Sequence, residues 1–280
     1  MFEIIICLIL FIFLFLLFFI SKNSSYSKQN FCKISIFLNY LNRTHFTTSF
    51  HDFYEPQEKQ YLDAIYCILL PERKKYIMNV LKKNEVPNVI FVDACTADKV
   101  SNLDYQILSS TFTLSSGIYG ALTKLPVHLS YLYCMKHALD NKYNTVLILE
   151  DDIFFQKPFP LINQYVKEFL MHRHLDILYL GYCLLNCKTE VENISKNILE
   201  IPEKTYILCK HAIVHRTNYF QNFLENHTIL NKKSDQYFLE YFKKNNIKRA
   251  ILREPVIFQN REKIKSRNGN NQQFLKVCKF

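Results

Sequence analysis

Two apolar runs with an amphipathic segment between them narrow the possible folds of this chain more than any other part of its sequence. The runs, residues 62–70 and 87–94, read LDAIYCILL and PNVIFVDA, and both are continuous enough to form strands buried on two faces. The segment 72–84 between them spaces its apolar residues three and four apart, which predicts a helix. This order predicts parallel strands joined by a crossover, and therefore an α/β fold.

The alternation of strand and helix patterns continues along the chain. Further strands are predicted at 146–149, 175–182, 204–216 and 247–255, and further helices at 126–139, 160–173, 217–226 and 234–246. Pro126 suits the first turn of the first of these helices. The 280 residues are 49% hydrophobic, which is enough for a packed core. We expect a single domain at 61–267 with a mainly parallel central sheet flanked by helices.

The amino terminus predicts a membrane anchor. Residues 4–20 are apolar without a break, and no small-x-small cleavage site follows them. We expect an uncleaved, single-pass transmembrane signal-anchor at 1–22, with a cleaved signal peptide as the alternative. Residues 23–60 are predicted to form a polar stem, and residues 268–280 a polar basic tail.

Signals for the membrane orientation conflict. Three lysines and no acid follow the apolar run closely, which would place the domain in the cytoplasm by the positive-inside rule. Four glycosylation sequons favour a lumenal glycoprotein of the endoplasmic reticulum or Golgi type, and they begin at Asn23, Asn42, Asn193 and Asn226. We expect the lumenal orientation, with the cytoplasmic face as the alternative. A lumenal domain is compatible with a disulfide from Cys183 or Cys187 to Cys209, and the sequence leaves this pairing open.

The net charge of +10 suits acidic or phosphate-bearing partners. The lysines and arginines are spread along the chain, without an arginine-rich arm or the cysteine and histidine spacing of a zinc finger. We therefore predict no nucleic-acid binding.

Three carboxylates, Glu150, Asp151 and Asp152, follow the predicted strand 146–149. Ligands of open α/β sheets bind at the carboxyl ends of parallel strands, where Asp93 also stands. In an extended backbone Glu150 and Asp152 point to one side and Asp151 to the other. Mg²⁺ and Mn²⁺ bind one or two carboxylates, and water and substrate phosphates complete the coordination. A solvated turn, with Asp152 capping the next element, fits the pattern equally well.

The segment VLILEDDIFF (146–155), with helices predicted on both sides and LDILYLG after them, resembles glycosyltransferase family 25. That family contains lipopolysaccharide-type galactosyltransferases and procollagen galactosyltransferases. The resemblance spans about residues 62–267 and is strongest at the Glu-Asp-Asp motif. It implies a GT-A type fold, a nucleotide-sugar donor that is most often UDP-linked, Mn²⁺ or Mg²⁺, and transfer of a hexose such as galactose with inversion. The acceptor would be a hydroxyl of a glycan, lipid or protein.

The resemblance also implies roles for residues that match the family's motifs. An Arg follows the family's first strand, a His precedes a later strand, an Asp opens a helix, and a Gln and then a Ser end the domain. The matching residues here are Arg73, His211, Asp235, Gln259 and Ser266.

We expect Asp152 and Glu150 to bind the metal and Asp235 to act as the catalytic base. Donor contacts are predicted for Asp151, Arg73, Asp93 and His211, and acceptor or lid contacts for Ser130, Gln259 and Ser266. Simpler roles stay open for three of them. Asp235 and Ser234 fit a helix cap, His211 fits a buried core histidine, and Arg73 fits a surface charge.

One stretch departs from the family pattern. The family carries a glycine-rich stretch that ends in Ser-His before the helix that precedes the acids. Residues 122–134 contain Ser130 but no glycine, and Tyr131 stands where the histidine is expected. This departure leaves open a catalytically degenerate fold that acts as a membrane-tethered binding protein. The acids themselves leave open a metal-dependent phosphohydrolase that uses them to activate water.

Overall fold

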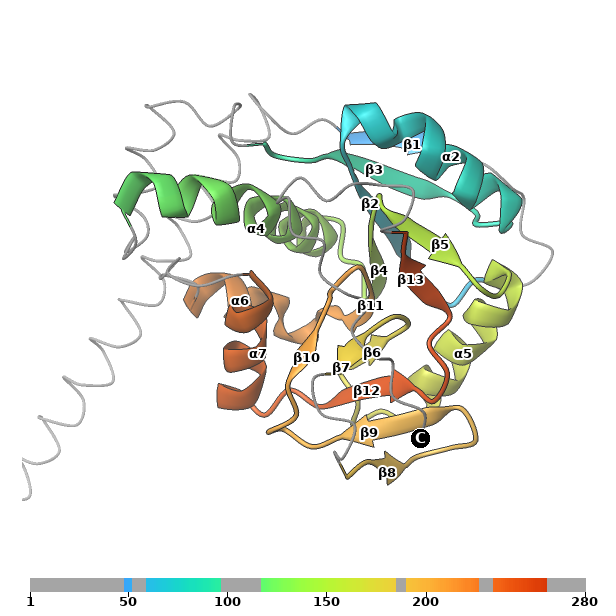
Figure 1. Cartoon of the computed structure of the whole chain (residues 1–280). Coiled ribbons are helices and arrows are strands. Elements are labelled where there is room, and N and C mark those ends of the chain that lie inside the picture. Colours follow the sequence, from blue (N-terminus) through green and yellow to red (C-terminus); the bar gives the residue numbers. More distant parts are fainter. Residues whose placement is uncertain (1–47, 52–58, 97–116, 185–189, 227–233, 261–280) are drawn as a thin grey trace, which may run out of the picture.

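The computed structural model describes residues 48–51, 59–96, 117–184, 190–226 and 234–260, with the backbone alone at 117–127, 183–184, 208, 226 and 234–236. These residues form a nine-stranded sheet with helices on both faces (Figure 1). The predicted α/β class is confirmed.

The central sheet and two short ribbons contain all strands of the described residues. In spatial order the sheet contains β1 (Thr48–His51), β3 (Val89–Asp93), β2 (Ala64–Leu69), β4 (Thr145–Glu150), β11 (Ala212–Arg216), β6 (Ile177–Tyr179), β12 (Arg249–Leu252), β9 (Ile198–Ile201) and β8 (Glu192–Asn193). The ribbons pair β7 (Cys183–Leu184) with β10 (Ile207–Leu208), and β5 (Ile153–Phe155) with β13 (Ile257–Gln259). The helices are η1 (Pro71–Arg73), α2 (Lys74–Lys83), α4 (Gly117–Asp140), α5 (Phe159–Met171), η3 (Thr217–Tyr219), α6 (Phe220–Asn226) and α7 (Ser234–Lys244).

The prediction of a mainly parallel sheet is wrong for the described residues. β2 runs parallel to both β3 and β4, and β12 runs parallel to β6. The remaining neighbouring pairs are antiparallel, and they include both pairs made by β11. A buried strand has the same apolar composition in either direction, so the pattern of β11 carries no signal for its direction. The sheet is mixed.

The start predicted for the long helix is also wrong. Helix α4 begins at Gly117 and passes through Pro126, which therefore lies inside the helix and not in its first turn. A proline removes one main-chain hydrogen bond and bends a helix, but neighbouring turns can continue on both sides of it. Pro126, which we expected in the first turn of a helix, thus marks only the local loss of one main-chain hydrogen bond within α4.

Side chains that alternate along each strand separate the core into two layers. In β4, Val146 and Ile148 pack in the cluster that contains residues of α4, α6 and α7. Leu147 and Leu149 pack in the other cluster, with residues of α2 and α5. Figure 1 shows the same division, because α2 and α5 cover one face of the sheet and α4, α6 and α7 cover the other.

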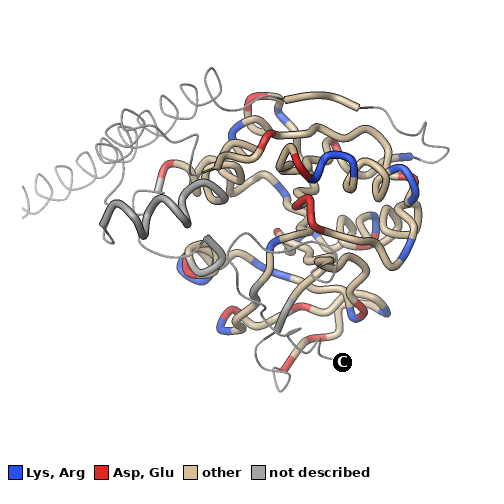
Figure 2. The backbone as a smooth tube through the Cα atoms, turned by 45° about the horizontal axis from the view of Figure 1, so that its top comes forward, with Lys and Arg blue, Asp and Glu red and all other residues tan. Residues whose placement is uncertain are grey.

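Several predictions concern segments outside the described residues. Residues 4–20, the tail 268–280 and Ser266 all belong to this group. Among the helices that the structure describes, none has both the length and the hydrophobicity needed to span a bilayer. Lysines and arginines of the described part are spread over the chain, and not gathered on one face (Figure 2).

Cys209 forms a disulfide. Cys67, Cys95 and Cys134 are free, so its partner is a cysteine whose side chain lies outside the described residues. The pairing with Cys183 or Cys187 therefore stays open.

A buried histidine links two tyrosines beneath α4. Tyr131 Oη lies 2.7 Å from His215 Nε2, and Tyr219 Oη lies 2.5 Å from His215 Nδ1. All three side chains are buried. Burial, together with the positive charge of Lys210, lowers the pKa of His215 to about 3. Tyr131, the residue that departs from the family pattern, is therefore part of the core.

The His215 pKa predicts how stability changes with pH. In the unfolded chain the histidine titrates near 6.5, so the folded state binds fewer protons between about pH 6.5 and 3. Its contribution to stability is complete above pH 6.5 and is lost as the pH falls, by up to about 1.4 kcal/mol per pH unit. H215N is expected to flatten this loss in denaturant unfolding at pH 7, 6 and 5. M171L, at the exposed end of α5, is the control and should keep the wild-type slope, because it changes no titratable group.

Candidate active site

The carboxyl ends of β2, β3 and β4 lie side by side at one edge of the sheet. β2 pairs with β3 on one side and β4 on the other, so the order of the strands reverses at β2. Such a reversal opens a crevice beyond the strand ends, which is the usual ligand site of open α/β sheets. The register sets Glu150 opposite Ile68 and Asp93 opposite Leu69. The acids predicted from the sequence therefore lie at this edge.

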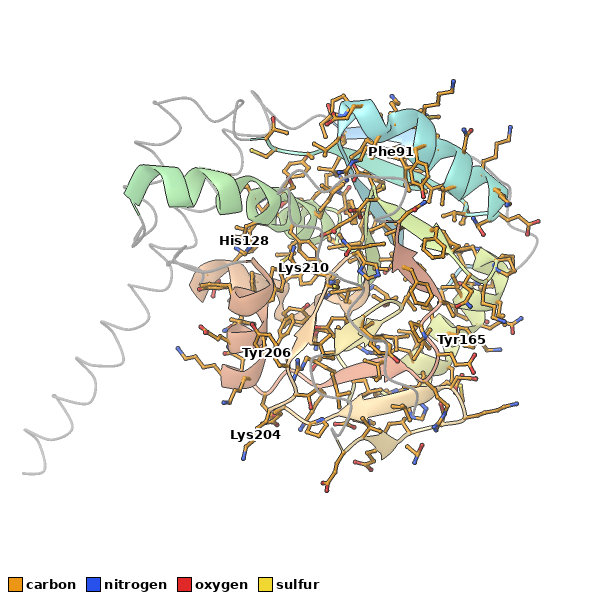
Figure 3. All side chains as sticks on the ribbon, in the orientation of Figure 1. Phe91, His128, Tyr165, Lys204, Tyr206 and Lys210 are labelled. Carbon is orange, nitrogen blue, oxygen red and sulfur yellow. The ribbon has the colours of Figure 1, made fainter. Side chains whose placement is uncertain are left out.

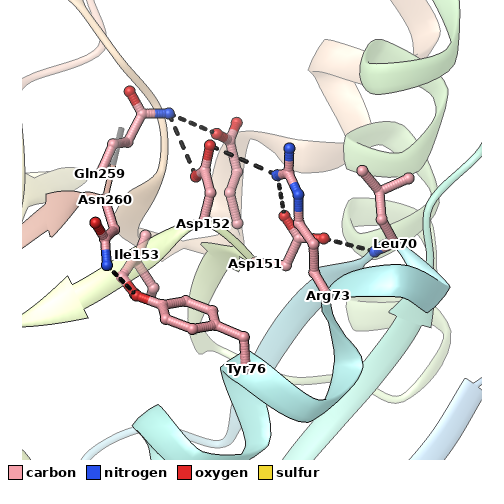
Figure 4. Close-up of polar contacts among 9 residues, drawn as sticks. Leu70, Arg73, Tyr76, Asp151, Asp152, Ile153, Gln259 and Asn260 are labelled. Atoms are coloured by element: carbon pink, nitrogen blue, oxygen red, sulfur yellow. Dashed lines mark hydrogen bonds and ion pairs between the residues drawn. The ribbon is translucent and has the colours of Figure 1, made fainter. Parts of the chain in front are cut away.

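Asp151 is held by the fold at this edge. It is 4% exposed, and its Oδ2 accepts a hydrogen bond of 2.6 Å from the main-chain amide of Leu70 (Figure 4). Its Oδ1 accepts a second bond of 2.8 Å from Arg73 Nη1. Burial raises the pKa of Asp151, while the bond from Leu70 and the charge of Arg73 oppose that rise. Asp151 thus fixes the start of η1 and the position of Arg73.

Glu150 and Asp152 converge on a different partner. Gln259 Nε2 donates to Glu150 Oε2 at 3.2 Å and to Asp152 Oδ1 at 3.5 Å (Figure 4). Asp152 Oδ2 also lies 3.6 Å from Arg73 Nη1, and the Asp152 side chain is 18% exposed. The expected division of the three acids is therefore visible in their contacts. Asp151 faces the main chain after β2, and the other two share one amide.

Three contacts hold the turn that contains the acids. The Asn260 amide donates to Asp152 O at 2.6 Å, and Tyr76 Oη donates to Ile153 O at 2.9 Å. Asn260 Nδ2 in turn donates to Tyr76 Oη at 2.8 Å. Burial raises the pKa of Tyr76 and the charge of Asp152 adds to this, although the bond from Asn260 opposes it, so Tyr76 keeps its proton at neutral pH. Sequence reasoning missed both residues, since Tyr76 shares the helical spacing of its apolar neighbours and Asn260 lies beyond the last predicted strand.

His211 and Gly181 connect this edge to β13. His211 Nε2 donates to Ile257 O at 3.0 Å, and His211 O accepts a bond of 2.9 Å from the Glu150 amide. A Cβ on Gly181 would lie 2.0 Å from Ile257 O and 2.3 Å from His211 Nε2. Only glycine fits there. The contact of His211 with a donor stays a prediction, and its observed role is to position β13.

The other predicted site residues lie in different surroundings. Asp93 is half-buried at the end of β3, on the same edge as the acids. Ser130 is fully buried, and its Oγ accepts a bond of 2.9 Å from the Cys95 amide, so it joins α4 to the end of β3. Asp235 is the second residue of α7, and its side chain lies outside the described residues. Ser266 also lies outside them.

Glu150 and Asp152 fit a site for a hard divalent cation. One nitrogen atom, Gln259 Nε2, lies within 3.5 Å of an oxygen of each, so both carboxylates reach a common point. Among the described residues no group of three or more His, Cys, Asp or Glu side chains is placed to hold a metal. Two carboxylates suffice for Mg²⁺ or Mn²⁺ when water and substrate phosphates complete the coordination.

Comparison with known protein families identifies the family of this chain. Residues 65–253 match the profile of glycosyltransferase family 25 (LPS biosynthesis protein), which is more than half of the 280 residues. The matched range contains Arg73, the three acids, His211 and Asp235, and it ends before Gln259. A comparison with curated individual proteins found no match. The resemblance based on the acidic motif is confirmed, and the chain belongs to glycosyltransferase family 25.

Proposed function

We propose that this protein is a membrane-anchored, metal-dependent hexosyltransferase with a GT-A type catalytic domain. It would transfer a sugar such as galactose from a UDP-linked donor to a hydroxyl of a glycan, lipid or protein, with inversion at the anomeric carbon. Family membership supports glycosyl transfer. The observation that carries the site is the convergence of Glu150 and Asp152 on one point at the edge where the strand order reverses.

Glu150 and Asp152 would hold the Mn²⁺ or Mg²⁺ ion. When bound, such an ion would act as a Lewis acid and neutralise charge on the departing diphosphate. Arg73 supports the same role, because its guanidinium lies beside Asp152 and is held by Asp151. A fixed cation at this point contributes to electrostatic stabilisation of a diphosphate without reorganising during the reaction.

Asp235 is the proposed catalytic base. Inversion requires that the acceptor oxygen bond to the anomeric carbon from the face opposite the diphosphate while the bond to the diphosphate oxygen breaks. A carboxylate beside the acceptor hydroxyl takes up the proton released in this step. The place of Asp235 in the first turn of α7 supports this role, since a residue at a helix start is held by the fold and can still face solvent.

A lumenal catalytic domain is the compartment that we propose. The disulfide at Cys209 supports it, because disulfides persist in oxidising compartments and are rare in the cytosol. The apolar run 4–20 would anchor the chain, and the segment between this run and β1 would join the anchor to the domain.

The proposal predicts metal-dependent cleavage of a nucleotide sugar. Full-length protein in detergent, incubated with UDP-hexoses and Mn²⁺, is expected to release UDP, and an acceptor should raise the rate. Excess EDTA is expected to reduce this release to background, and added Mn²⁺ or Mg²⁺ should restore it, because two carboxylates alone bind the ion reversibly. The measurement is coupled detection of UDP.

Other outcomes of the same assay separate the alternatives. Full activity in excess chelator would contradict the metal site. Phosphate release from simple phosphate esters, without cleavage of any sugar donor, would indicate a phosphohydrolase. Binding of UDP-sugars without turnover of any donor would indicate a degenerate transferase.

A further inference from the structure

Lys210 is a buried cation outside the acidic site. It lies one residue before His211 and is 5% exposed. Its Nζ lies 4.3 Å from the ring centroid of Tyr131 and 5.6 Å from that of Phe238. These rings belong to α4 and α7, so Lys210, labelled in Figure 3, lies on the face of the sheet opposite α2.

The hydrogen-bonding capacity of Lys210 is unused within the described part of the chain. An ammonium group has three donors, but Nζ is buried and has no hydrogen-bond partner among the described residues. The two aromatic rings offset part of the cost of removing the charge from water. They do not replace the acceptors that water would supply. A buried cation in this state favours an anion that reaches it.

A small cavity gives access to Lys210. It measures about 10 Å³ and is partly open to the surface. Its volume is close to the least that holds one water molecule, which is also the size of one carboxylate or phosphate oxygen. Apart from Lys210 and Cys209, its walls are apolar or aromatic, and they include Ile207, Ile213, Phe238 and Phe242. Lys210 is therefore the cationic group of an otherwise largely apolar recess.

We propose that Lys210 binds an oxyanion, which inserts one phosphate or carboxylate oxygen into this recess while the remainder of the group stays at its mouth. The entering oxygen would accept a charge-assisted hydrogen bond and would neutralise the buried charge. This inference rests on the proposed function, since it assigns the oxyanion to one of the two substrates.

The oxyanion has two possible sources, the diphosphate of the donor and an acid group on the acceptor. The geometry favours the acceptor. Arg73 and the metal-site acids lie beside α2, whereas Lys210 contacts rings from α4 and α7. Asp235, the proposed base, lies three residues before Phe238 in α7. Lys210 would thus select acceptors that carry a carboxylate or phosphate near the reacting hydroxyl.

Anion binding by full-length protein in detergent tests the proposal. Inorganic phosphate is expected to raise the unfolding temperature of the wild type. K210M should lose this response, because its apparent affinity for phosphate should fall by about tenfold or more. Without phosphate, K210M should be at least as stable as the wild type, because it removes an unpaired buried charge. K248M removes one charge at an exposed ion pair and should respond like the wild type.

The arms of the experiment separate the two sources. An affinity for UDP with Mn²⁺ that is unchanged in K210M supports an acid group of the acceptor, and a drop of about tenfold assigns Lys210 to the donor diphosphate. A phosphate response that is absent in the wild type, or equal in K210M, overturns the proposal. If K210M does not fold, the phosphate response of K210Q is compared with that of the wild type instead. These readouts need no turnover, so their failure is distinct from a failure of the proposed transferase activity.

Discussion

Replacement of Asp152 by asparagine is expected to lower the rate of sugar transfer by about a thousandfold or more while the domain stays folded. The amide keeps the size of the side chain but loses the charge that a divalent cation requires, and one of its two oxygens becomes a nitrogen. Asp152 is also the more exposed of the two aspartates, so its charge contributes less to the fold than that of Asp151. The D152A variant should show the same loss.

The measurement pairs UDP release with thermal unfolding for each variant. D140N is the matched control, since Asp140 is an exposed aspartate that forms an ion pair with Lys136 at the end of α4. It should retain wild-type activity. If D152N kept more than about a tenth of the wild-type rate, Asp152 would not be the metal ligand that the proposed mechanism needs.

The second large effect is expected at Gly181, which lies against β13. In G181A the new methyl group would lie 2.0 Å from the carbonyl oxygen of Ile257, a main-chain atom that cannot move without β13. The amides of Val256 and Ile257 both donate to Leu180 O, so a displacement would also break these bonds. We expect a loss of about 3 kcal/mol or more in the free energy of unfolding, together with a loss of activity.

Denaturant unfolding and UDP release would be measured on the same preparation of G181A. The control is G120A, because Gly120 lies inside α4 and alanine has the higher helix propensity. It should not lower the free energy of unfolding. Wild-type stability and turnover in G181A would mean that β13 does not depend on the close approach at Gly181.

Continuous apolar runs made the central strands predictable. β2, β3 and β4 lie within or beside the runs 62–70, 87–94 and 146–149, because strands covered by helices on both faces need apolar residues at every position. The position of the acids at one edge of the sheet followed from the order of strands and helices along the chain. A strand–helix–strand unit brings the carboxyl ends of its two strands together. These local signals suffice to place Glu150, Asp151 and Asp152.

Contacts between distant segments left no comparable signal. β5 and β13 have three residues each, which is too short for a period, and Gln259 meets Glu150 across 109 residues of chain. Tyr76 shares the helical spacing of its apolar neighbours, so its hydroxyl contact with Ile153 was not predicted. The resemblance to the family pointed to Gln259 only as an acceptor or lid contact, so its bonds to Glu150 and Asp152 were not expected, and neither were the contacts of Asn260.

The ribbon of β5 and β13 also has a consequence for the order in which the protein matures. Synthesis delivers the acids long before Gln259 and Asn260, which contact them from more than a hundred residues further along the chain. Until those residues leave the ribosome, the turn lacks the amides that bring Glu150 and Asp152 to a common point. The capacity to bind a cation would therefore arise late in biosynthesis, after most of the sheet has been made.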